Sequence, residues 1–502
     1  MKTLSIETLL SEIQLDSEST VPLYKQLYQQ LHQAIVEGKF PPGIYLQSTR
    51  DLSKILKVSR NTVLQAIQQL IAEGFLEAKA GSGTRITSNL PRNFFWKDYT
   101  EQTHEKEPVS IRSISRRGET YAAGKFTNRQ KMDGPYIFTL SVPALDHFPV
   151  EMWSRLVARH HRKASLNLFD YNVGEPAGYQ PLREAIANYV QVVRGVKCTA
   201  EQVIITNGAQ HAIFLATQVL LDPGDKVWLE NPGHIGTRSI LQASNAKIVS
   251  VPVDNHGLNV EAGIRLAPDA SMVCITPHQM PVGSLMNLKR RLELLRWARE
   301  EGAWILEDDY DHEFTYRGRP IMSLQGLDNA NRVIYIGTFS KSMFPSLRIG
   351  YMIVPHDLVQ PLSMARLTID VQTSTIQQAA LADFIHKGYL SNHIRRMRKL
   401  YGQRRNHLLK LLSKELSEWV TPGIATTGFH MMAWLHSDIS DKVICEEGRK
   451  HGLSLVPVSN LYIGKALRSG LLLGYAATDE ENMTKGVMIL KKILQEYSAR
   501  PS

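Results

Sequence analysis

The sequence predicts an α/β fold, because from about residue 136 onward apolar runs of strand length alternate with helical stretches. The runs lie at residues 203–206, 227–230, 272–276, 304–308 and 333–337. This alternation predicts a parallel sheet covered on both faces by helices. Two further observations set the boundaries. Residues 1–88 contain short helical patterns and a glycine-rich hairpin, and residues 89–135 are polar and aperiodic, which is typical of a linker. We therefore expect domains at 1–88 and 136–502.

Composition excludes several classes of protein. The three cysteines, Cys198, Cys274 and Cys445, are far apart in the 502 residues, which argues against a disulfide framework or a zinc site. No run approaches the roughly 20 apolar residues that span a bilayer, and residues 1–20 form a poor signal peptide. We expect a cytoplasmic protein without a metal or a membrane partner. The net charge is +10, but residues 1–90 carry nine Lys/Arg against eight Asp/Glu, so charge alone does not establish DNA binding.

The first 88 residues predict a winged helix-turn-helix. A first helix is expected after Pro22, with apolar residues at near-helical spacing. A short helix over 48–56 follows, with Leu52, Ile55 and Leu56 facing inward, and Ser59 caps a longer helix after a tight turn. Two short strands over 75–79 and 84–87 flank a glycine turn and form the wing. Two helices joined by a tight turn are typical of a helix-turn-helix.

The second helix of this motif has a polar N-terminal face of the kind that enters a major groove. The candidate residues are Arg60, Asn61, Thr62 and Gln65. The segment LQSTRDLSKILKVSRNTVLQAIQQLIAEGFLEAKAGSGTRI resembles the winged helix of the GntR family. That resemblance implies contacts with double-stranded operator DNA through Arg50, Arg60, Thr62 and the wing residues Ser82, Gly83 and Thr84. A winged helix that binds protein instead of DNA remains the alternative.

The C-terminal block offers candidates for each part of a pyridoxal 5'-phosphate site. Such a site needs an amine for a Schiff base, a carboxylate for the pyridine nitrogen, a partner for the ring oxygen O3', a flat stacking group and phosphate donors. Lys341 follows a predicted strand, where ligands of α/β sheets bind. Thr338, Ser340 and Arg348 surround it in the sequence and supply donors for a phosphate. A lysine after a strand is more often simply solvated, so this pattern depends on the other candidates.

Four acids lie within residues 307–311, at the end of the preceding predicted strand. Because carboxylates are costly to bury, we do not expect them in the core. Asp308 is the candidate partner of the pyridine nitrogen, and Tyr310 is the candidate partner of O3'. An acidic helix cap is the alternative interpretation.

Three further turns complete the candidate site. Gly208, Ala209 and Gln210 join a strand to a helix, where backbone N–H groups attract phosphate. His234 follows another strand and can stack on the ring. Gln279 lies in the loop after residues 272–276, beside the expected cofactor.

The order of these residues resembles fold-type I aminotransferases, and together with the first domain it resembles the MocR/GabR-type regulators of the GntR family. The stretches EDDYDHEFTYRGRP and GTFSKSMFPSLRIGY are especially similar to that branch. The resemblance covers nearly the whole chain apart from the linker. It implies a large, parallel-sheet-rich domain, a smaller C-terminal domain, Lys341 as an internal aldimine and a homodimer in which each DNA-binding domain packs on the partner. It also implies that an amino compound, or pyridoxal phosphate itself, is the signal.

The sequence departs from the family at several positions. His234 replaces the usual stacking tyrosine, Met280 replaces an aromatic residue, and Gly236 stands where the 4-aminobutyrate-sensing member has an arginine. Arg468 is a weak substitute for an effector-carboxylate arginine, so 4-aminobutyrate is not the expected effector.

We expect a pyridoxal phosphate-dependent transcription regulator. A catalytically active aminotransferase with an ancillary DNA-binding domain is the alternative, and a domain that has lost its cofactor is the third interpretation.

Overall fold

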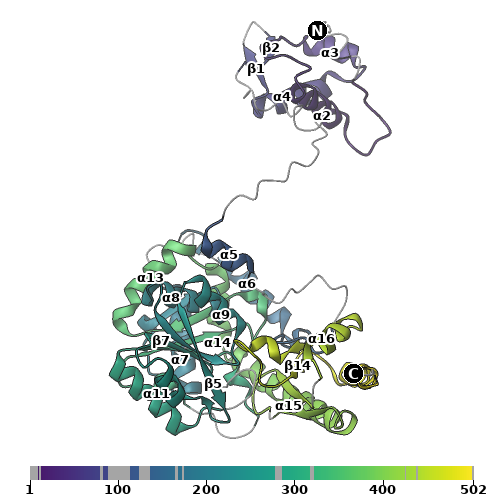
Figure 1. Ribbon diagram of the computed structural model, residues 1–502. Coiled ribbons are helices and arrows are strands. Elements are labelled where there is room, and N and C mark those ends of the chain that lie inside the picture. The colour runs from purple at the N-terminus through teal and green to yellow at the C-terminus, as the bar shows by residue number, and fades with distance from the viewer. Residues whose placement is uncertain are drawn as a thin grey trace. The chain divides into compact units, whose positions relative to one another are not determined.

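The computed structural model contains two compact units, Met1–Ser113 and Ile114–Ser502, and each is described by itself (Figure 1). The structure describes residues 10, 13–79, 83–88, 114–123, 136–163, 168–171, 175–277, 285–316, 322–423, 425–436 and 439–499. Most of the predicted linker, the wing residue Ser82 and the loop residues Gln279 and Met280 lie outside this description.

The first unit folds around three helices and a hairpin. The helices are α2 (Leu23–Val36), α3 (Thr49–Ile55) and α4 (Arg60–Ala72), and the strands are β1 (Leu76–Lys79) and β2 (Gly83–Ile86). The strands pair antiparallel, with Leu76 opposite Ile86. A core that includes Leu27, Leu52 and Leu70 joins the elements. The prediction that Ile55 faces inward is wrong: its side chain is 40% exposed, because α3 ends at this residue and only Leu52 of the helix is fully buried.

A helix, α5 (Arg116–Ala123), lies within the stretch that was predicted to be a linker. It belongs to the second unit and packs on α9 (Ile235–Ala243). The sequence analysis did not predict it, because its composition is polar and its eight residues are too few to establish an apolar period.

The second unit contains an eight-stranded sheet in the order β3-β10-β9-β8-β7-β4-β5-β6. Its strands are β3 (Val203–Thr206), β4 (Lys226–Asn231), β5 (Lys247–Asp254), β6 (Gly257–Leu258), β7 (Met272–Ile275), β8 (Trp304–Asp308), β9 (Val333–Thr338) and β10 (Gly350–Ile353). The central neighbours β5, β4, β7, β8 and β9 run parallel. The predicted parallel sheet is therefore mixed, since β10 runs antiparallel between β3 and β9, and β6 runs antiparallel to β5.

Helices cover both faces of this sheet, as its apolar strands predicted. On one face, Leu229, Leu306 and Ile336 pack with α8 (Ala209–Leu220), α9 and α13 (His356–Asp370). The opposite face packs on α7 (Gln180–Arg194), α10 (Val260–Leu266), α11 (Leu288–Glu301) and α14 (Thr375–His386). Alternate residues of each strand thus serve different cores. The carboxyl ends of β4, β7, β8 and β9 lie along one edge, where α/β folds bind ligands.

A smaller antiparallel sheet follows in the chain, in the order β11-β12-β14-β13. Its strands are β11 (Val420–Pro422), β12 (His430–Leu435), β13 (Val456–Pro457) and β14 (Gly470–Gly474). The remaining helices of the second unit are α6 (Val150–Lys163), α12 (Leu324–Leu327), α15 (Tyr389–Glu415), α16 (Asp441–Lys450) and α17 (Glu480–Ser498). The long helix α15 contacts α14 and α17, and its buried face shares a core with Leu471 and Leu473 of β14.

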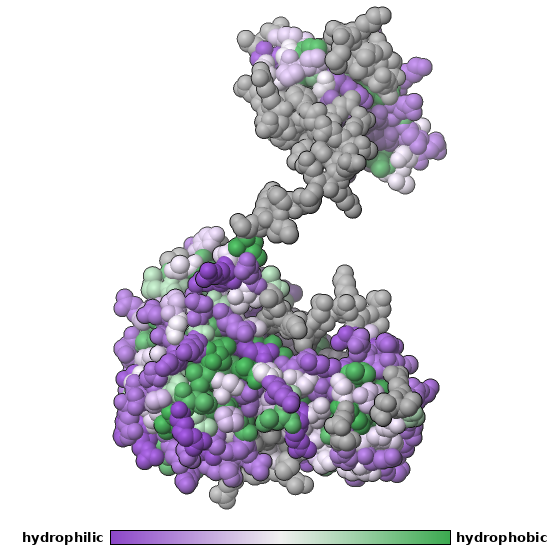
Figure 2. Space-filling view, viewed as in Figure 1, coloured by the Kyte–Doolittle hydropathy of each residue, from purple (hydrophilic) through white to green (hydrophobic). Residues whose placement is uncertain are grey.

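The surface is mostly hydrophilic, but hydrophobic side chains gather in a patch on the viewed face of the second unit (Figure 2). Within the part of the chain that the structure describes, no helix combines the length and apolarity needed to cross a membrane.

Candidate functional site

The N-terminal end of α4 carries the predicted DNA-contacting residues. Arg60, Asn61 and Gln65 are exposed, whereas Thr62 is half-buried. Ser59 caps the helix by accepting a hydrogen bond from the Thr62 N–H at 3.1 Å, and the two hydroxyls lie 2.8 Å apart. The Thr62 hydroxyl is therefore engaged in the cap, and the longer Arg60, Asn61 and Gln65 side chains are the ones directed to solvent.

The start of α3 lies beside this helix end. Ser48 caps α3 through the Asp51 N–H at 3.2 Å, and Arg50 is exposed in the first turn. The Arg60 Nε donates to the Thr49 hydroxyl at 3.4 Å, which links the two helices. In the wing, Gly83 is exposed and Thr84 is half-buried. The structure thus gathers Arg50 and Arg60 at one end of the motif.

In the second unit, Lys341 follows β9 and its amine lies at the carboxyl edge of the sheet. Its Nζ donates a hydrogen bond to the backbone carbonyl of Ser141 at 3.0 Å, and the side chain is half-buried. β8 and β9 are adjacent and parallel, so their carboxyl ends lie at the same edge of the sheet. Asp308 is the last residue of β8, and Lys341 follows β9 at that edge. The amine influences the electrostatics of both Asp308 and His234.

Asp308 ends β8 and lines a small pocket together with Glu230, His234 and Thr276. Its Oδ1 atom is buried and has no hydrogen-bonding partner among the described residues. Burial, followed by the Asp309 carboxylate, raises the pKa of Asp308 to about 7, while the Lys341 ammonium opposes that rise. A buried acceptor without a donor is costly, so the site suits a ligand that brings an N–H group.

An anion-binding arrangement lies at the start of α8. Gly208 precedes the helix with φ 85°, and Ala209 and Gln210 form its first turn. The Arg348 Nη2 donates to the Asn207 carbonyl at 2.6 Å, and a Cβ at Gly208 would lie 3.0 Å from the same nitrogen. Glycine therefore lets the guanidinium lie against the helix N-terminus, which attracts anions.

Thr338 and Ser340, at and just after the end of β9, are the other two predicted phosphate ligands. The Thr338 hydroxyl accepts a hydrogen bond from the Ser340 N–H at 3.2 Å. The Ser340 Oγ is buried and has no partner among the residues described. An unpaired hydroxyl beside the lysine suits a phosphate oxygen.

His234 caps α9 and lines the same pocket as Asp308. Its Nδ1 accepts a hydrogen bond from the Thr237 N–H at 3.3 Å. Burial, then the Lys341 ammonium, lowers the pKa of His234 to about 4, so the ring is neutral. A Cβ at Gly236 would clash with the Gln210 amide nitrogen and lie 2.7 Å from the His234 ring, so an arginine at this position would require both side chains to shift.

Tyr310 lies two residues beyond Asp308 and is half-buried. Burial, followed by nearby carboxylates led by Asp311, raises the pKa of its phenol well above the usual value. The phenol therefore keeps its proton and can act as a hydrogen-bond donor. Gln279, the other predicted residue of this region, lies outside the described residues.

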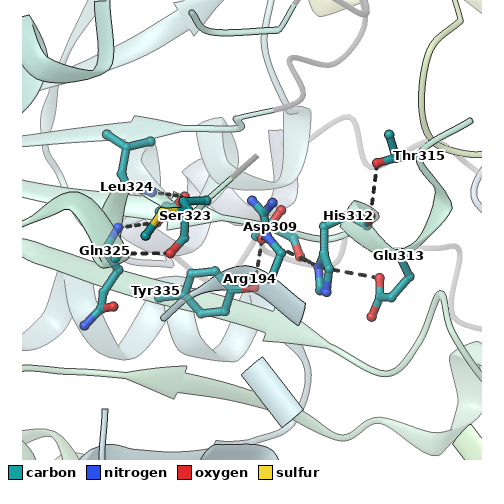
Figure 3. A network of polar contacts seen from close by, with 12 residues as sticks. Arg194, Asp309, His312, Glu313, Thr315, Ser323, Leu324, Gln325 and Tyr335 are labelled. Carbon is teal, nitrogen blue, oxygen red and sulfur yellow. Dashed lines mark hydrogen bonds and ion pairs between the residues drawn. The ribbon is translucent and has the colours of Figure 1, made fainter. Parts of the chain in front are cut away.

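The expectation that the acids of residues 307–311 avoid the core is wrong, because Glu307, Asp309 and Asp311 are buried. Figure 3 shows Asp309 beside Arg194 and Tyr335. Asp309 is buried and pairs with Arg194 at 2.5 Å, and the Tyr335 hydroxyl donates to it at 2.8 Å. Glu307 is also buried and accepts hydrogen bonds from the first N–H groups of α12, at Leu324 and Gln325. Their burial is tolerated because each carboxylate is paired. Glu307 thus stabilises the start of α12 from another part of the chain, while Ser323 is the N-cap residue of that helix.

Two residues of this region were missed by sequence reasoning. Glu230 ends β4 and lines the pocket; its Oε2 accepts the Thr276 hydroxyl at 2.7 Å, while its Oε1 is buried without a described partner. Its place at a strand end, one residue before Asn231, could have identified it. His430 begins β12, and burial, then the Lys341 ammonium, lowers its pKa to about 4. No local sequence signal links His430 to residues 89 positions earlier.

The donor set fits pyridoxal phosphate. The buried Asp308 oxygen suits the ring nitrogen, the Lys341 amine suits the aldehyde, and the turn at Gly208 with Arg348 and Ser340 suits the phosphate. These features suit different ends of one molecule, and among the described residues the Asp308 Oδ1 and the Ser340 Oγ are buried without a hydrogen-bonding partner.

Comparison with known proteins agrees with this division of the chain. The family described as bacterial regulatory proteins, gntR family, matches residues 23–86, and the family described as aminotransferase class I and II matches residues 139–490. The probable rhizopine catabolism regulatory protein MocR of Rhizobium meliloti is 36% identical over 478 residues, which cover 95% of this chain and 94% of that protein. The two proteins therefore share the whole two-domain arrangement.

A second regulator and a solved enzyme extend the comparison. The HTH-type pyridoxine biosynthesis transcriptional regulator PdxR of Corynebacterium glutamicum is 29% identical over 94% of this chain and 96% of its own. The α-aminoadipate aminotransferase LysN of Thermus thermophilus, solved with N-(5'-phosphopyridoxyl)-L-leucine, superposes with a TM-score of 0.70 and 25% identity, over 77% of this chain and 98% of its own. The predicted fold-type I aminotransferase domain is confirmed.

Proposed function

Because this chain belongs to the MocR-type regulators, in which a GntR-family winged helix precedes an aminotransferase class I and II domain, we propose that it senses an amino compound, or pyridoxal phosphate itself, at Lys341. The chain is a DNA-binding transcription regulator, and pyridoxal phosphate is its cofactor. One observation carries the proposed sensing role: the Lys341 amine and the unpaired, buried Asp308 oxygen lie on the same edge of the sheet.

Each candidate residue has a place in this proposal. When bound, the cofactor supplies an aldehyde that captures amines and an electron-withdrawing ring. Lys341 would supply the resident amine, Asp308 would accept a hydrogen bond from the protonated ring nitrogen, Tyr310 would donate to O3' and His234 would stack on the ring. The phosphate ligands are the turn Gly208, Ala209 and Gln210, together with Thr338, Ser340 and Arg348, and Gln279 lies beside the ring.

The contact of Lys341 suggests how an amine could act on the protein. The Lys341 amine donates to the Ser141 carbonyl at 3.0 Å, and an effector amine that replaced Lys341 on the cofactor's aldehyde would leave Lys341 to make this contact. Three residues earlier, Phe138 is tied to the small sheet through the Gly474 N–H. Whether Lys341 is bound to the cofactor thereby affects the conformation of residues 138–141, which lead from Lys341 to the small sheet. An effector shifts the equilibrium between the two conformations of this segment only if it binds one of them more tightly.

We also propose that the protein acts as a homodimer on paired half-sites in the cytoplasm, where operator DNA lies. Large apolar side chains are exposed on the second unit, including Phe169, Tyr171, Met364 and Ile369. The Gln372 amide donates to the Asp170 carbonyl at 3.2 Å, which ties these two segments together. Exposed apolar surface of this kind suits a subunit interface. Sedimentation of the full chain tests it: a monomer at micromolar concentration would refute it.

Absorbance spectroscopy tests the sensing role. Purified wild-type protein should take up pyridoxal phosphate and show the absorbance of a lysine-bound cofactor, and Lys341→Ala should not. Lys387→Ala is the matched control, because Lys387 is a surface residue paired with Asp383. A wild-type protein that stays colourless with added pyridoxal phosphate would overturn the proposal.

A DNA shift assay tests the coupling of the two domains. Fragments from the region next to the protein's own gene should shift at physiological salt, and an effective amine should change the shift in wild type but not in Lys341→Ala. A shift that is absent, or that disappears at modest salt for every sequence, would contradict specific operator binding.

The retained Lys341 and Asp308 also favour a second candidate, an active aminotransferase with an ancillary DNA-binding unit. These residues suffice chemically for half of a transamination. Multiple turnovers with an amino acid and a common keto acid, without a specific DNA shift, would favour that candidate.

A further inference from the structure

His430 lies at the end of the small sheet that approaches the Lys341 pocket. It begins β12, and its partner across the sheet is Gly474 of β14. Met432 shares its face of the sheet, because alternate residues of a strand point the same way. Met432 packs with Leu472 in a cluster whose borders include Leu140 and Ile235. These border residues directly precede Ser141 and directly follow His234.

The backbone connects this face to the lysine. A Cβ at Gly474 would clash with the Thr139 carbonyl, so residue 139 crosses the sheet beside His430. Two residues later, the Ser141 carbonyl accepts the Lys341 amine at 3.0 Å. The lysine ammonium also acts electrostatically on the His430 imidazole. His430 therefore lies on the small sheet beside the segment that carries the Ser141 carbonyl, which is the acceptor of the Lys341 amine.

The His430 imidazole is available for a ligand. It is half-buried, and within the described residues neither ring nitrogen has a hydrogen-bonding partner. Burial, then the Lys341 ammonium, holds its pKa near 4, so it is neutral at physiological pH. A neutral imidazole offers one donor and one acceptor, which matches a hydroxyl group. A carboxylate offers acceptors only, and its charge would have no protonated imidazole to meet.

Two arginines that approach the same cluster are engaged elsewhere. The Arg468 guanidinium lies 4.4 Å from the Trp434 ring centroid. Trp434 is four residues beyond His430, or about 13 Å along the strand. Arg238 donates to the carbonyls of Tyr462 and Asn460 at 3.0 and 3.3 Å. In the described part of this cluster, the group positioned to meet a ligand is thus the uncharged His430.

We propose that His430 is a specificity-determining residue that contacts the far end of the amine effector and selects a hydroxyl group there over a carboxylate. This inference rests on the proposed sensing role of the Lys341 pocket. The effector class is therefore a hydroxylated amine.

The test compares amino alcohols with amino acids of equal chain length: 2-aminoethanol with glycine, 3-aminopropan-1-ol with β-alanine and 4-aminobutan-1-ol with 4-aminobutyrate. Full-length protein carrying pyridoxal phosphate is titrated with each amine, and the change in cofactor absorbance gives the half-saturating concentration. For at least one length, the wild type should bind the alcohol about 10-fold more tightly than the acid.

Variants then assign this preference to His430. His430→Leu should weaken alcohol binding about 5- to 10-fold, the effect of one lost hydrogen bond, and leave the matching acid within about 2-fold. His430→Asn, which keeps a donor and an acceptor, should recover most of the loss. His436→Leu is the control, since His436 follows the same strand and is hydrogen-bonded to Thr421.

Several outcomes would overturn the inference. They are equal or better binding of the acids at every length, an equal loss of both series in His430→Leu, or no response to any amine by a protein that carries the cofactor. Failure of the wild type to take up pyridoxal phosphate is a different result, and it would refute the proposed sensing role itself. Cofactor affinity of each variant, measured before the amines are added, shows whether the pocket has folded.

Discussion

Replacing Asp308 by asparagine should stabilise the cofactor-free protein and at the same time weaken cofactor binding. The carboxyl lies at the end of β8 with Oδ1 buried and unpaired, and its pKa rises from 3.8 to about 7 mainly through burial, then through Asp309. At about 1.4 kcal/mol per pKa unit, this corresponds to a cost of about 4 kcal/mol for the ionised form. Because the residue is partly exposed to the pocket, screening reduces the cost to about 2 to 4 kcal/mol.

The pH dependence follows from the direction of that change. The folded state holds its proton up to about pH 7, whereas the unfolded chain loses it near pH 3.8. The folded state therefore binds more protons between these values, and stability falls as pH rises through this window and stays low above it. Asparagine removes the ionisation, so its benefit should be full at pH 8 and less than half as large at pH 5.

Thermal unfolding measures this effect. With an unfolding entropy of ~2.1 cal/mol/K per residue, the unit Ile114–Ser502 should gain about 2 to 5 °C at pH 8. Loss of the charged partner should weaken pyridoxal phosphate binding roughly 30- to 1,000-fold, equivalent to about 2 to 4 kcal/mol. Asp357→Asn is the control, because Asp357 is exposed at the start of α13. A cofactor-free Asp308→Asn protein that is no more stable than wild type at pH 8, or that binds the cofactor equally well, would refute the reasoning.

Three other substitutions probe separate parts of the molecule. Asp309→Asn should destabilise the second unit by about 3 to 5 kcal/mol in denaturant unfolding, because Arg194 is left buried without its counter-charge; a loss below about 1 kcal/mol would show that the pair is dispensable. Arg194→Met should give a similar loss in the same assay, and the double variant should recover part of it, whereas additive losses would contradict a coupled pair. Arg60→Ala should weaken operator binding about 5- to 150-fold in fluorescence anisotropy, while Lys25→Ala on α2 should change it little; equal effects of the two would argue against α4 as the DNA-contacting helix.

The elements with strong local signals could be predicted from the sequence. The strands 203–206 and 304–308 were placed correctly, because each is a short apolar run between turn residues. The predicted cap Ser59 also marked the start of α4, whereas Ser48, predicted as the first residue of a helix, is the N-cap of α3. The antiparallel direction of β10 could not be predicted, since the four residues Gly350–Ile353 carry no record of which strands they join. Strand direction depends on pairings with residues far away in the chain.

The candidate site was predictable to the extent that it lies on adjacent strands. Asp308 and Lys341 follow β8 and β9, and parallel neighbours bring their carboxyl ends together. His430 belongs to the second, smaller sheet, which packs near this region. The segment 138–141, which connects the small sheet with Lys341, lies more than 280 residues before His430 in the sequence. Glu230 was overlooked although it lies near the end of a predicted strand, because its hydrogen bond with Thr276 depends on the pairing of β4 with β7.

Alternation along β8 explains why neighbouring acids have opposite expected effects on stability. Leu306 and Asp308 point to the face that packs on α8 and α9, and Asp308 there meets the pocket. Glu307 and Asp309 point to the other face, where α12 and Arg194 supply their partners. Of the four acids in this run, Glu307 and Asp309 thus have hydrogen-bonding or ionic partners on one face, whereas the Asp308 Oδ1 on the other face has none among the described residues. Since Asp308 is the member without a described partner, it is the one whose burial cost a bound cofactor can offset.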